Sequence, residues 1–195
     1  MVKSGNEHMP PADFEKRPVK LETIKEGAVY KRIHWTSRSP VQFNQSDAGR
    51  YNSPKGEFGV LYIAKNLAGC FSETLLREKS SLIDQADINA RSVSEIIFTA
   101  SLKLISFYGP GLARAGATAI VSSGDWDISQ AWSLALWRRK EQPYGILYRA
   151  KHDNDELCAA IFDRAGKKLK KGKTWPLKDD PELPELFERY QVGIG

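Results

Sequence analysis

Four sets of residues in the 195-residue sequence combine the chemistry needed to bind and transform an anionic ligand. Arg32 lies in the alternating segment AVYKRIHW, and Arg50 follows a glycine in GRYN, where the backbone is free to turn sharply. A guanidinium group matches the geometry of phosphate. Tyr62 lies in the apolar segment GVLYIAK, and Glu73 lies in LAGCFSETLLREKS. These four side chains are the first candidates for a functional site.

The arginines also have purely structural interpretations, which the residues alone leave open. Alternation places Arg32 on the strand face opposite Ile33, and an exposed sheet face accounts for a charge there. The segment Arg50, Tyr51 and Asn52 fits ordinary turn chemistry. The alternative is that these three residues stand at the mouth of a pocket for an anion.

Glu73 has two interpretations as well. Helical periodicity puts it off the apolar stripe of its segment. On that face it either forms a surface ion pair with Arg77, one turn later, or uses a helix face left bare by Gly69 to stabilise a developing cation. Spacing does not choose between these two roles.

The composition bounds the class of protein. With 41% hydrophobic residues the chain can bury a substantial core as a single domain, and we expect an arm or tail at 1–22 before a domain at 23–195. No apolar run reaches the length of about 18 residues typical of a membrane span, and no signal peptide is evident, so we expect a cytoplasmic protein that does not enter membranes. Two cysteines and three histidines without clustering indicate no metal site.

The net charge of +5 is concentrated in RAGKKLKKGK, at 164–173. We expect a solvated loop there, and the alternative is a docking patch for nucleic acid or an acidic partner. Without interleaved aromatic residues or a DNA-reading helix, direct binding of nucleic acid is not favoured.

Periodicity and turn residues predict an α+β domain with a central mixed, largely antiparallel sheet flanked by helices. The predicted strands cover 28–35, 59–65, 94–108 (one kinked strand or two), 144–152 and 156–165. The predicted helices cover 67–80, 110–116, 127–141 (with Asp127 or Ser129 as its cap) and 181–191. The sequence lacks GxGxxG, Walker A, GxSxG and HExxH motifs, which removes the Rossmann, P-loop, α/β-hydrolase and zincin classes as motif-based interpretations.

Taken in order, these segments resemble the RES domain, a family named for an arginine, a glutamate and a serine. The similarity spans about residues 27–165 and is most specific in GRYN, in the strand that follows it and in the helix glutamate. The matching positions are Gly49, Arg50, Tyr51, Asn52, Gly59, Leu61, Tyr62, Ala64 and Glu73. Several spaced matches in the right order are much harder to obtain by chance than any one alone.

The resemblance implies a fold similar to ADP-ribosyltransferase toxins and a toxin of a bacterial toxin–antitoxin pair. It implies NAD as substrate, cleaved between nicotinamide and ribose by hydrolysis or, with inorganic phosphate as co-substrate, by phosphorolysis. The implied partner is an Xre-type helix-turn-helix antitoxin, through which DNA would be reached. Transfer of ADP-ribose to a protein is the alternative reaction.

Carried over by position, the resemblance assigns catalytic roles to Arg32, Tyr62 and Glu73, and ligand binding to Arg50, Tyr51, Asn52 and the residue at position 150. The family serine ends a segment GI-x-Y-x-S, and GILYRA places Ala150 there instead. We therefore expect weakened turnover if that hydroxyl assists catalysis, and a catalytically weakened NAD-binding module is a further alternative.

Overall fold

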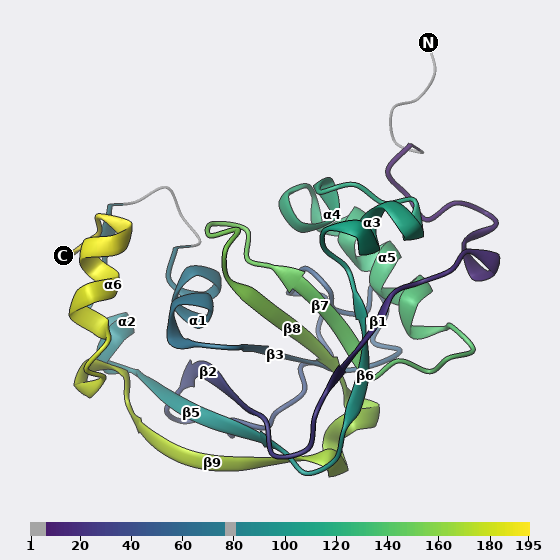
Figure 1. The fold of residues 1–195 in the computed structure, drawn as a ribbon. Coiled ribbons are helices and arrows are strands. Elements are labelled where there is room, and N and C mark those ends of the chain that lie inside the picture. The colour runs from purple at the N-terminus through teal and green to yellow at the C-terminus, as the bar shows by residue number, and fades with distance from the viewer. Residues whose placement is uncertain (1–6, 77–80) are drawn as a thin grey trace.

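The computed structural model describes residues 7–76 and 81–195, and an eight-stranded sheet organises them (Figure 1). Its strand order is β1-β6-β7-β8-β3-β2-β5-β9, and all neighbours are antiparallel except β6 and β7. This is the predicted α+β architecture with a mixed, largely antiparallel sheet. The strands are β1 Leu21–Ile24, β2 Val29–Trp35, β3 Val60–Ala64, β5 Arg91–Phe98, β6 Leu102–Ser106, β7 Gly145–Arg149, β8 Leu157–Phe162 and β9 Leu169–Pro176.

Helices lie at both ends of the curved sheet. In Figure 1, α3, α4 and α5 gather at one end, α2 and α6 lie at the other, and α1 lies between them. A short parallel pair, β4 Leu82–Ile83 with β10 Gly193–Ile194, lies beside α6. The helices are α1 Leu67–Thr74, α2 Gln85–Asn89, α3 Pro110–Ala115, α4 Ile120–Ser123, α5 Trp126–Trp137 and α6 Leu183–Tyr190. Within the described ranges no helix is both long and apolar enough to span a bilayer, the longest having 12 residues.

The sheet is buried on both faces. In β3, Leu61 and Ile63 enter one apolar cluster, and Val60 and Ala64 enter another. The second cluster also contains Phe71 of α1, so this face of β3 is covered by a helix. Because both faces of β3 are covered, the strand is apolar throughout except at Tyr62.

The sheet is nearly divided between β2 and β3. These strands pair through a single residue pair, Lys31 with Ala64, whereas β2 pairs with β5 along its whole length. Beyond Lys31 the two strands part, and the segment between them in sequence, 36–59, crosses this region with an isolated bridge from Asn44 to Val60. The parting leaves room for a cleft between two otherwise continuous halves of the sheet.

The predicted elements are confirmed in outline, with β5 and β6 forming two strands rather than one. Helix α1 ends at Thr74, and the end of the helix predicted at 67–80 lies outside the described residues. Two expectations are wrong. The N-cap of α5 is Asp125 rather than Asp127 or Ser129. The stretch 164–173 is not a loop: it comprises a 3-10 helix, Asp163–Lys168, and the start of β9.

The lysine run has a structural explanation. β9 is an edge strand, and lysines on an edge discourage pairing with another chain. Because edge strands are often rich in lysine, the lysine run led to the prediction of a solvated loop where the structure has an edge strand.

The segment before β1 packs on the domain. Phe14, in a short 3-10 helix at Phe14–Lys16, is only 3% exposed and meets the ring of Trp132 edge-on at 5.0 Å. The Trp132 Nε1 donates to the backbone oxygen of His8, and Arg139 Nη1 donates to the backbone oxygen of Phe14. The described part of the predicted arm is thus fixed against α5 rather than detached.

Candidate functional site

A cavity of about 760 Å³ opens where β2 and β3 part. This volume lies within the range of roughly 300–1,000 Å³ typical of sites for small organic ligands. Its wall includes Arg32 from β2, Tyr62 from β3, Glu73 from α1 and Arg50 from the connecting segment. The four side chains singled out by residue type, which are distant in sequence, therefore share one cavity.

Arg32 is half-buried and held at the cavity by backbone oxygens. Its Nη1 donates to the carbonyl oxygen of Pro40 at 2.8 Å and to that of Gln42 at 3.1 Å. Burial lowers the pKa of Arg32 to about 10, which leaves the guanidinium charged at neutral pH. A charged guanidinium that is partly removed from water attracts an anionic ligand more strongly than an exposed one does.

Arg50 is also half-buried, and the N-terminal region of α5 fixes it. Its Nη1 donates to the backbone oxygen of Gly124 at 2.7 Å and to the Ser129 hydroxyl at 3.2 Å. Position 49 requires a glycine because the Asn52 side chain lies close to it, and a Cβ at this position would be 2.5 Å from the Asn52 Oδ1. The glycine predicted to allow a turn thus also makes room for the asparagine side chain.

Tyr51 and Asn52 do not line the cavity, so the prediction that they stand at its mouth is wrong. Both are fully buried. The Tyr51 hydroxyl pairs with the Ser122 hydroxyl at 3.0 Å, and the Asn52 Nδ2 donates to the backbone oxygen of Ser46 at 2.6 Å. Their polar groups hold the loop that carries Arg50, and a turn of this kind buries its asparagine to satisfy backbone groups.

Tyr62 joins this loop to the cavity. Its hydroxyl donates to Asn52 Oδ1 and accepts the backbone N–H of Tyr51, both at 2.8 Å. Burial raises the pKa of Tyr62, which keeps the phenol neutral. Its ring lines the cavity while its hydroxyl braces the loop.

Glu73 is half-buried at the cavity wall, in the last turn of α1. One carboxylate oxygen accepts the Tyr148 hydroxyl at 3.1 Å, and the other accepts the backbone N–H of Lys151 at 2.8 Å. A negative charge at a helix C-terminus is unfavourable to the helix dipole, and the two hydrogen bonds to Glu73 offset this cost. Arg77, the alternative ion-pair partner, lies outside the described residues.

Sequence reasoning missed the other residues around this carboxylate. Tyr148 is 2% exposed, and burial together with the charge of Glu73 raises its pKa. Lys151 and His152 line the same wall; burial and the neighbouring Lys151 charge lower the pKa of His152. The alternating pattern of GILYRA could have indicated on which face of its strand Tyr148 lies. No sequence pattern could have indicated the backbone N–H of Lys151.

His34 lines the β2 side of the cavity. It is buried, and its Nε2 lies 2.8 Å from the Ser94 hydroxyl. Burial lowers the pKa of His34. Among residues 7–76 and 81–195, no group of three or more His, Cys, Asp or Glu side chains is arranged to hold a metal ion.

Comparison with known proteins identifies the family of this chain. Residues 28–180 match the model of the RES domain.

The chain belongs to the RES domain family.

One curated relative and one solved structure are similar to this chain. The chain is 30% identical over 111 residues to the probable toxin y4kH of Sinorhizobium fredii, which covers 56% of this chain and 87% of the relative. Its fold matches a chain in the crystal structure of the M. tuberculosis MbcT-MbcA toxin–antitoxin complex with a TM-score of 0.67, at 18% identity, over 87% of this chain and 91% of that one. At that identity the second comparison supports the fold alone.

Ala150 stands where the resemblance implies a serine, and the structure gives this position an indirect role. Ala150 is 3% exposed and is not part of the cavity wall, in contrast to the expected role in binding ribose or phosphate. It directly follows β7, and its N–H donates to the backbone oxygen of Glu156, closing the loop that carries Lys151. The position thus lies behind the cavity, one residue before the N–H that holds Glu73.

Proposed function

We propose that this RES domain is the toxin of a toxin–antitoxin pair and that it depletes NAD by cleaving the bond between nicotinamide and ribose. The observation that carries the proposal is the cavity in which Glu73, fixed by Tyr148 and Lys151, faces the same space as Arg32 and Arg50. A dinucleotide needs this pairing of one anionic and two cationic groups, because its reacting centre becomes positive while its pyrophosphate is negative.

The chemistry follows from the leaving group. Nicotinamide in NAD is cationic at its ring nitrogen, which takes the electron pair of the glycosidic bond and departs neutral. The ribose is left with oxocarbenium character at C1, which a nearby carboxylate stabilises. We assign that role to Glu73, whose orientation is set by two hydrogen bonds before substrate arrives.

The two arginines bind the negative part of the reaction. We assign contact with the pyrophosphate, or with an attacking inorganic phosphate, to Arg32 and Arg50, whose guanidinium groups are partly withdrawn from water. Charge-assisted hydrogen bonds are stronger in such an environment. The Tyr62 ring supplies an apolar surface for the ribose or nicotinamide.

The partner proposal follows from the relatives. Because one relative is a probable toxin and the matched structure is a toxin–antitoxin complex, we propose an antitoxin partner. The Xre-type helix-turn-helix domain of that partner is what the RES resemblance implies. DNA is then bound by the antitoxin, and the lysines on β9 serve the edge strand rather than a nucleic acid.

Mass spectrometry of products tests the reaction class. The purified protein is incubated with NAD, with and without inorganic phosphate. Release of nicotinamide together with phosphorylated ADP-ribose indicates phosphorolysis, and free ADP-ribose indicates hydrolysis. ADP-ribose attached to a protein indicates the transferase alternative, and intact NAD after prolonged incubation contradicts the proposal.

A further inference from the structure

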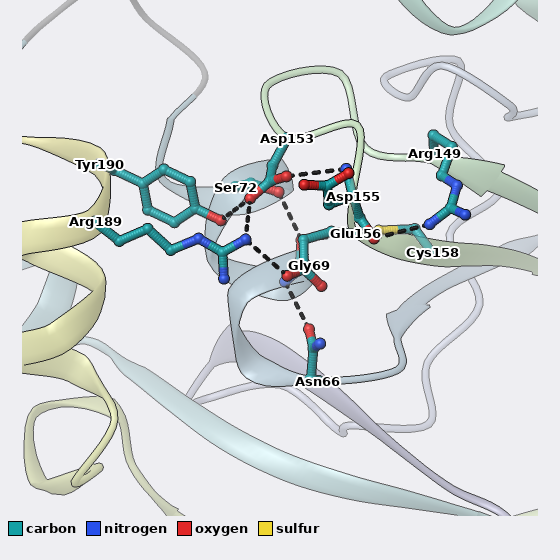
Figure 2. A network of polar contacts seen from close by, with 10 residues as sticks. All are labelled: Asn66, Gly69, Ser72, Arg149, Asp153, Asp155, Glu156, Cys158, Arg189 and Tyr190. Atoms are coloured by element: carbon teal, nitrogen blue, oxygen red, sulfur yellow. Dashed lines mark hydrogen bonds and ion pairs between the residues drawn. The ribbon is translucent and has the colours of Figure 1, made fainter.

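The C-terminal helix α6 lies beyond the part of the chain that matches the family model, which ends at residue 180. It is nevertheless connected to the site through a polar network (Figure 2). Arg189 and Tyr190, in the last turn of α6, point toward Asp153 and Glu156 in the loop between β7 and β8. This loop, 150–156, also carries the backbone N–H that binds Glu73.

Asp153 is the centre of the loop. Its Oδ1 accepts the backbone N–H of Asp155 at 3.0 Å, and its backbone oxygen accepts the N–H of Glu156 at 3.1 Å. Its Oδ2 accepts the Tyr190 hydroxyl at 2.7 Å and Arg189 Nη2 at 2.6 Å. The conformation of the loop is therefore tied to the position of α6.

Ion pairs connect Arg189, whose side chain is 41% exposed, to Asp153 and Glu156. The Asp153 and Glu156 side chains are 11% and 7% exposed, and Arg189 Nη2 reaches both, the second at 3.1 Å. Although burial favours its neutral form, hydrogen bonds from Tyr190 and the Asp155 N–H, with the charge of Arg189, lower the pKa of Asp153. Without the guanidinium, two carboxylates would share a largely buried space without their cation.

The same helix also packs on α1, which carries Glu73. The Tyr190 ring stacks on the Phe71 ring with centroids 5.5 Å apart and an interplanar angle of 7°, and the Phe187 ring meets Phe71 edge-on at 5.9 Å. Helix α6 thus contacts both elements joined by the hydrogen bond from Lys151 to Glu73. Tyr190 contacts both, with its ring on Phe71 of α1 and its hydroxyl on Asp153 of the loop.

We propose that Arg189 and Tyr190 are positioning residues, which hold loop 150–156 so that the Lys151 N–H orients the Glu73 carboxylate. This inference rests on the proposed function for its catalytic consequence. The positioning itself is a structural relation that can be measured without any reaction.

The test uses four variants of the full chain, of which Arg189→Lys restores the charge that Arg189→Gln removes. Arg189→Gln removes the charge, and Tyr190→Phe removes one hydroxyl while keeping the ring stack and with it the packing of the helix. Arg138→Gln is the matched control, because Arg138 is an exposed arginine that lies 3.9 Å from the Glu57 carboxylate and does not line the cavity.

Hydrogen exchange of the Lys151 amide gives the first readout, and kcat and KM for nicotinamide release give the second. In Arg189→Gln we expect exchange to accelerate about tenfold and kcat to fall about tenfold with little change in KM, because a small displacement of a catalytic group slows the reacting step. Tyr190→Phe should also accelerate exchange and lower kcat, but by smaller factors. Arg189→Lys, which keeps the charge, should recover most of kcat.

The inference is overturned if the hydrogen-exchange rate of the Lys151 amide in Arg189→Gln and in Tyr190→Phe equals the rate in Arg138→Gln. It is also overturned if exchange accelerates while kcat stays at the wild-type value. If the wild-type protein releases no nicotinamide, the proposed function fails, and the exchange rates still decide whether α6 positions the loop.

Discussion

At the scale of residues, the site depends on hydroxyl and amide groups that hydrogen-bond to other protein groups and so hold the charged side chains in place. Tyr51, Asn52 and Tyr62 form a chain of hydrogen bonds behind Arg50, and Tyr148 plays the same supporting part behind Glu73. Such groups are costly to bury and are tolerated when each one finds a partner. The result is a cavity whose charged side chains have fixed directions before a ligand binds.

Removing the Tyr62 hydroxyl tests this support. Tyr62→Phe leaves the Asn52 oxygen and the Tyr51 N–H without their partner, which should lower the free energy of unfolding by about 2 kcal/mol. Urea unfolding measures the change. Because both residues act through one hydrogen bond, Asn52→Ala should cost less in the Tyr62→Phe background than in the wild type, and strictly additive losses would contradict the shared network.

Residue types and spacing singled out four of the side chains that line the cavity, because guanidinium, phenol and carboxylate groups have recognisable chemistry. The same approach misplaced Tyr51 and Asn52, whose polarity suggested exposure. It had no means of finding the Lys151 N–H, since every residue carries an equivalent group. Only the fold shows which backbone N–H lies beside Glu73.

At the scale of elements, the cavity exists because β2 and β3 pair at one position and then separate. Periodicity predicted both strands but not their separation, because alternation describes the faces of a strand and not its neighbours. The pairing of β9 with β5 was likewise not predicted, and its lysines were interpreted as a loop. Pairing partners depend on long-range contacts that a local pattern does not encode.

Helix α1 is held close to the sheet by the absence of a side chain. A Cβ at Gly69 would lie 2.8 Å from the Ala64 Cβ and 3.4 Å from the Cys158 Sγ. The glycine predicted to bare a helix face for a ligand therefore also allows α1 to pack on β3 and β8. The position of Glu73, one turn further on, depends on this approach.

Gly69→Ala tests the packing of this element. We expect a loss of about 1–3 kcal/mol in the free energy of unfolding, because the helix must move away from Ala64. Gly166→Ala is a suitable control, since a Cβ there would meet only an ordinary contact at 3.5 Å from Phe43. Thermal or urea unfolding compares the two, and equal stability would show that α1 is not confined at Gly69.

At the scale of the whole molecule, segments far apart in sequence secure the two ends of the domain. The N-terminal segment packs on α5 through Phe14, and α6 packs on α1 through Tyr190. The prolines and mixed charge of the first segment predicted a surface arm, and its sequence gave no sign that Phe14 is buried. A single aromatic residue without periodic neighbours carries too little pattern to reveal a core position.

Phe14→Ala tests whether this segment belongs to the folded domain. Loss of a buried aromatic side chain should reduce the free energy of unfolding by about 3–5 kcal/mol. Leu21→Ala, at a position that is 37% exposed, should have a much smaller effect. A Phe14→Ala protein as stable as Leu21→Ala would mean that the segment rests loosely on the surface.

The central claim is that the cavity between β2 and β3 binds NAD and that Glu73 promotes its cleavage. The most direct measurement compares nicotinamide release by the wild-type protein and by Glu73→Gln, with NAD affinity measured by calorimetry and the exposed Glu15→Gln as a control. We predict that Glu73→Gln slows release by at least about a hundredfold while it changes the dissociation constant for NAD less than about threefold. Release by Glu73→Gln at the wild-type rate would contradict the account.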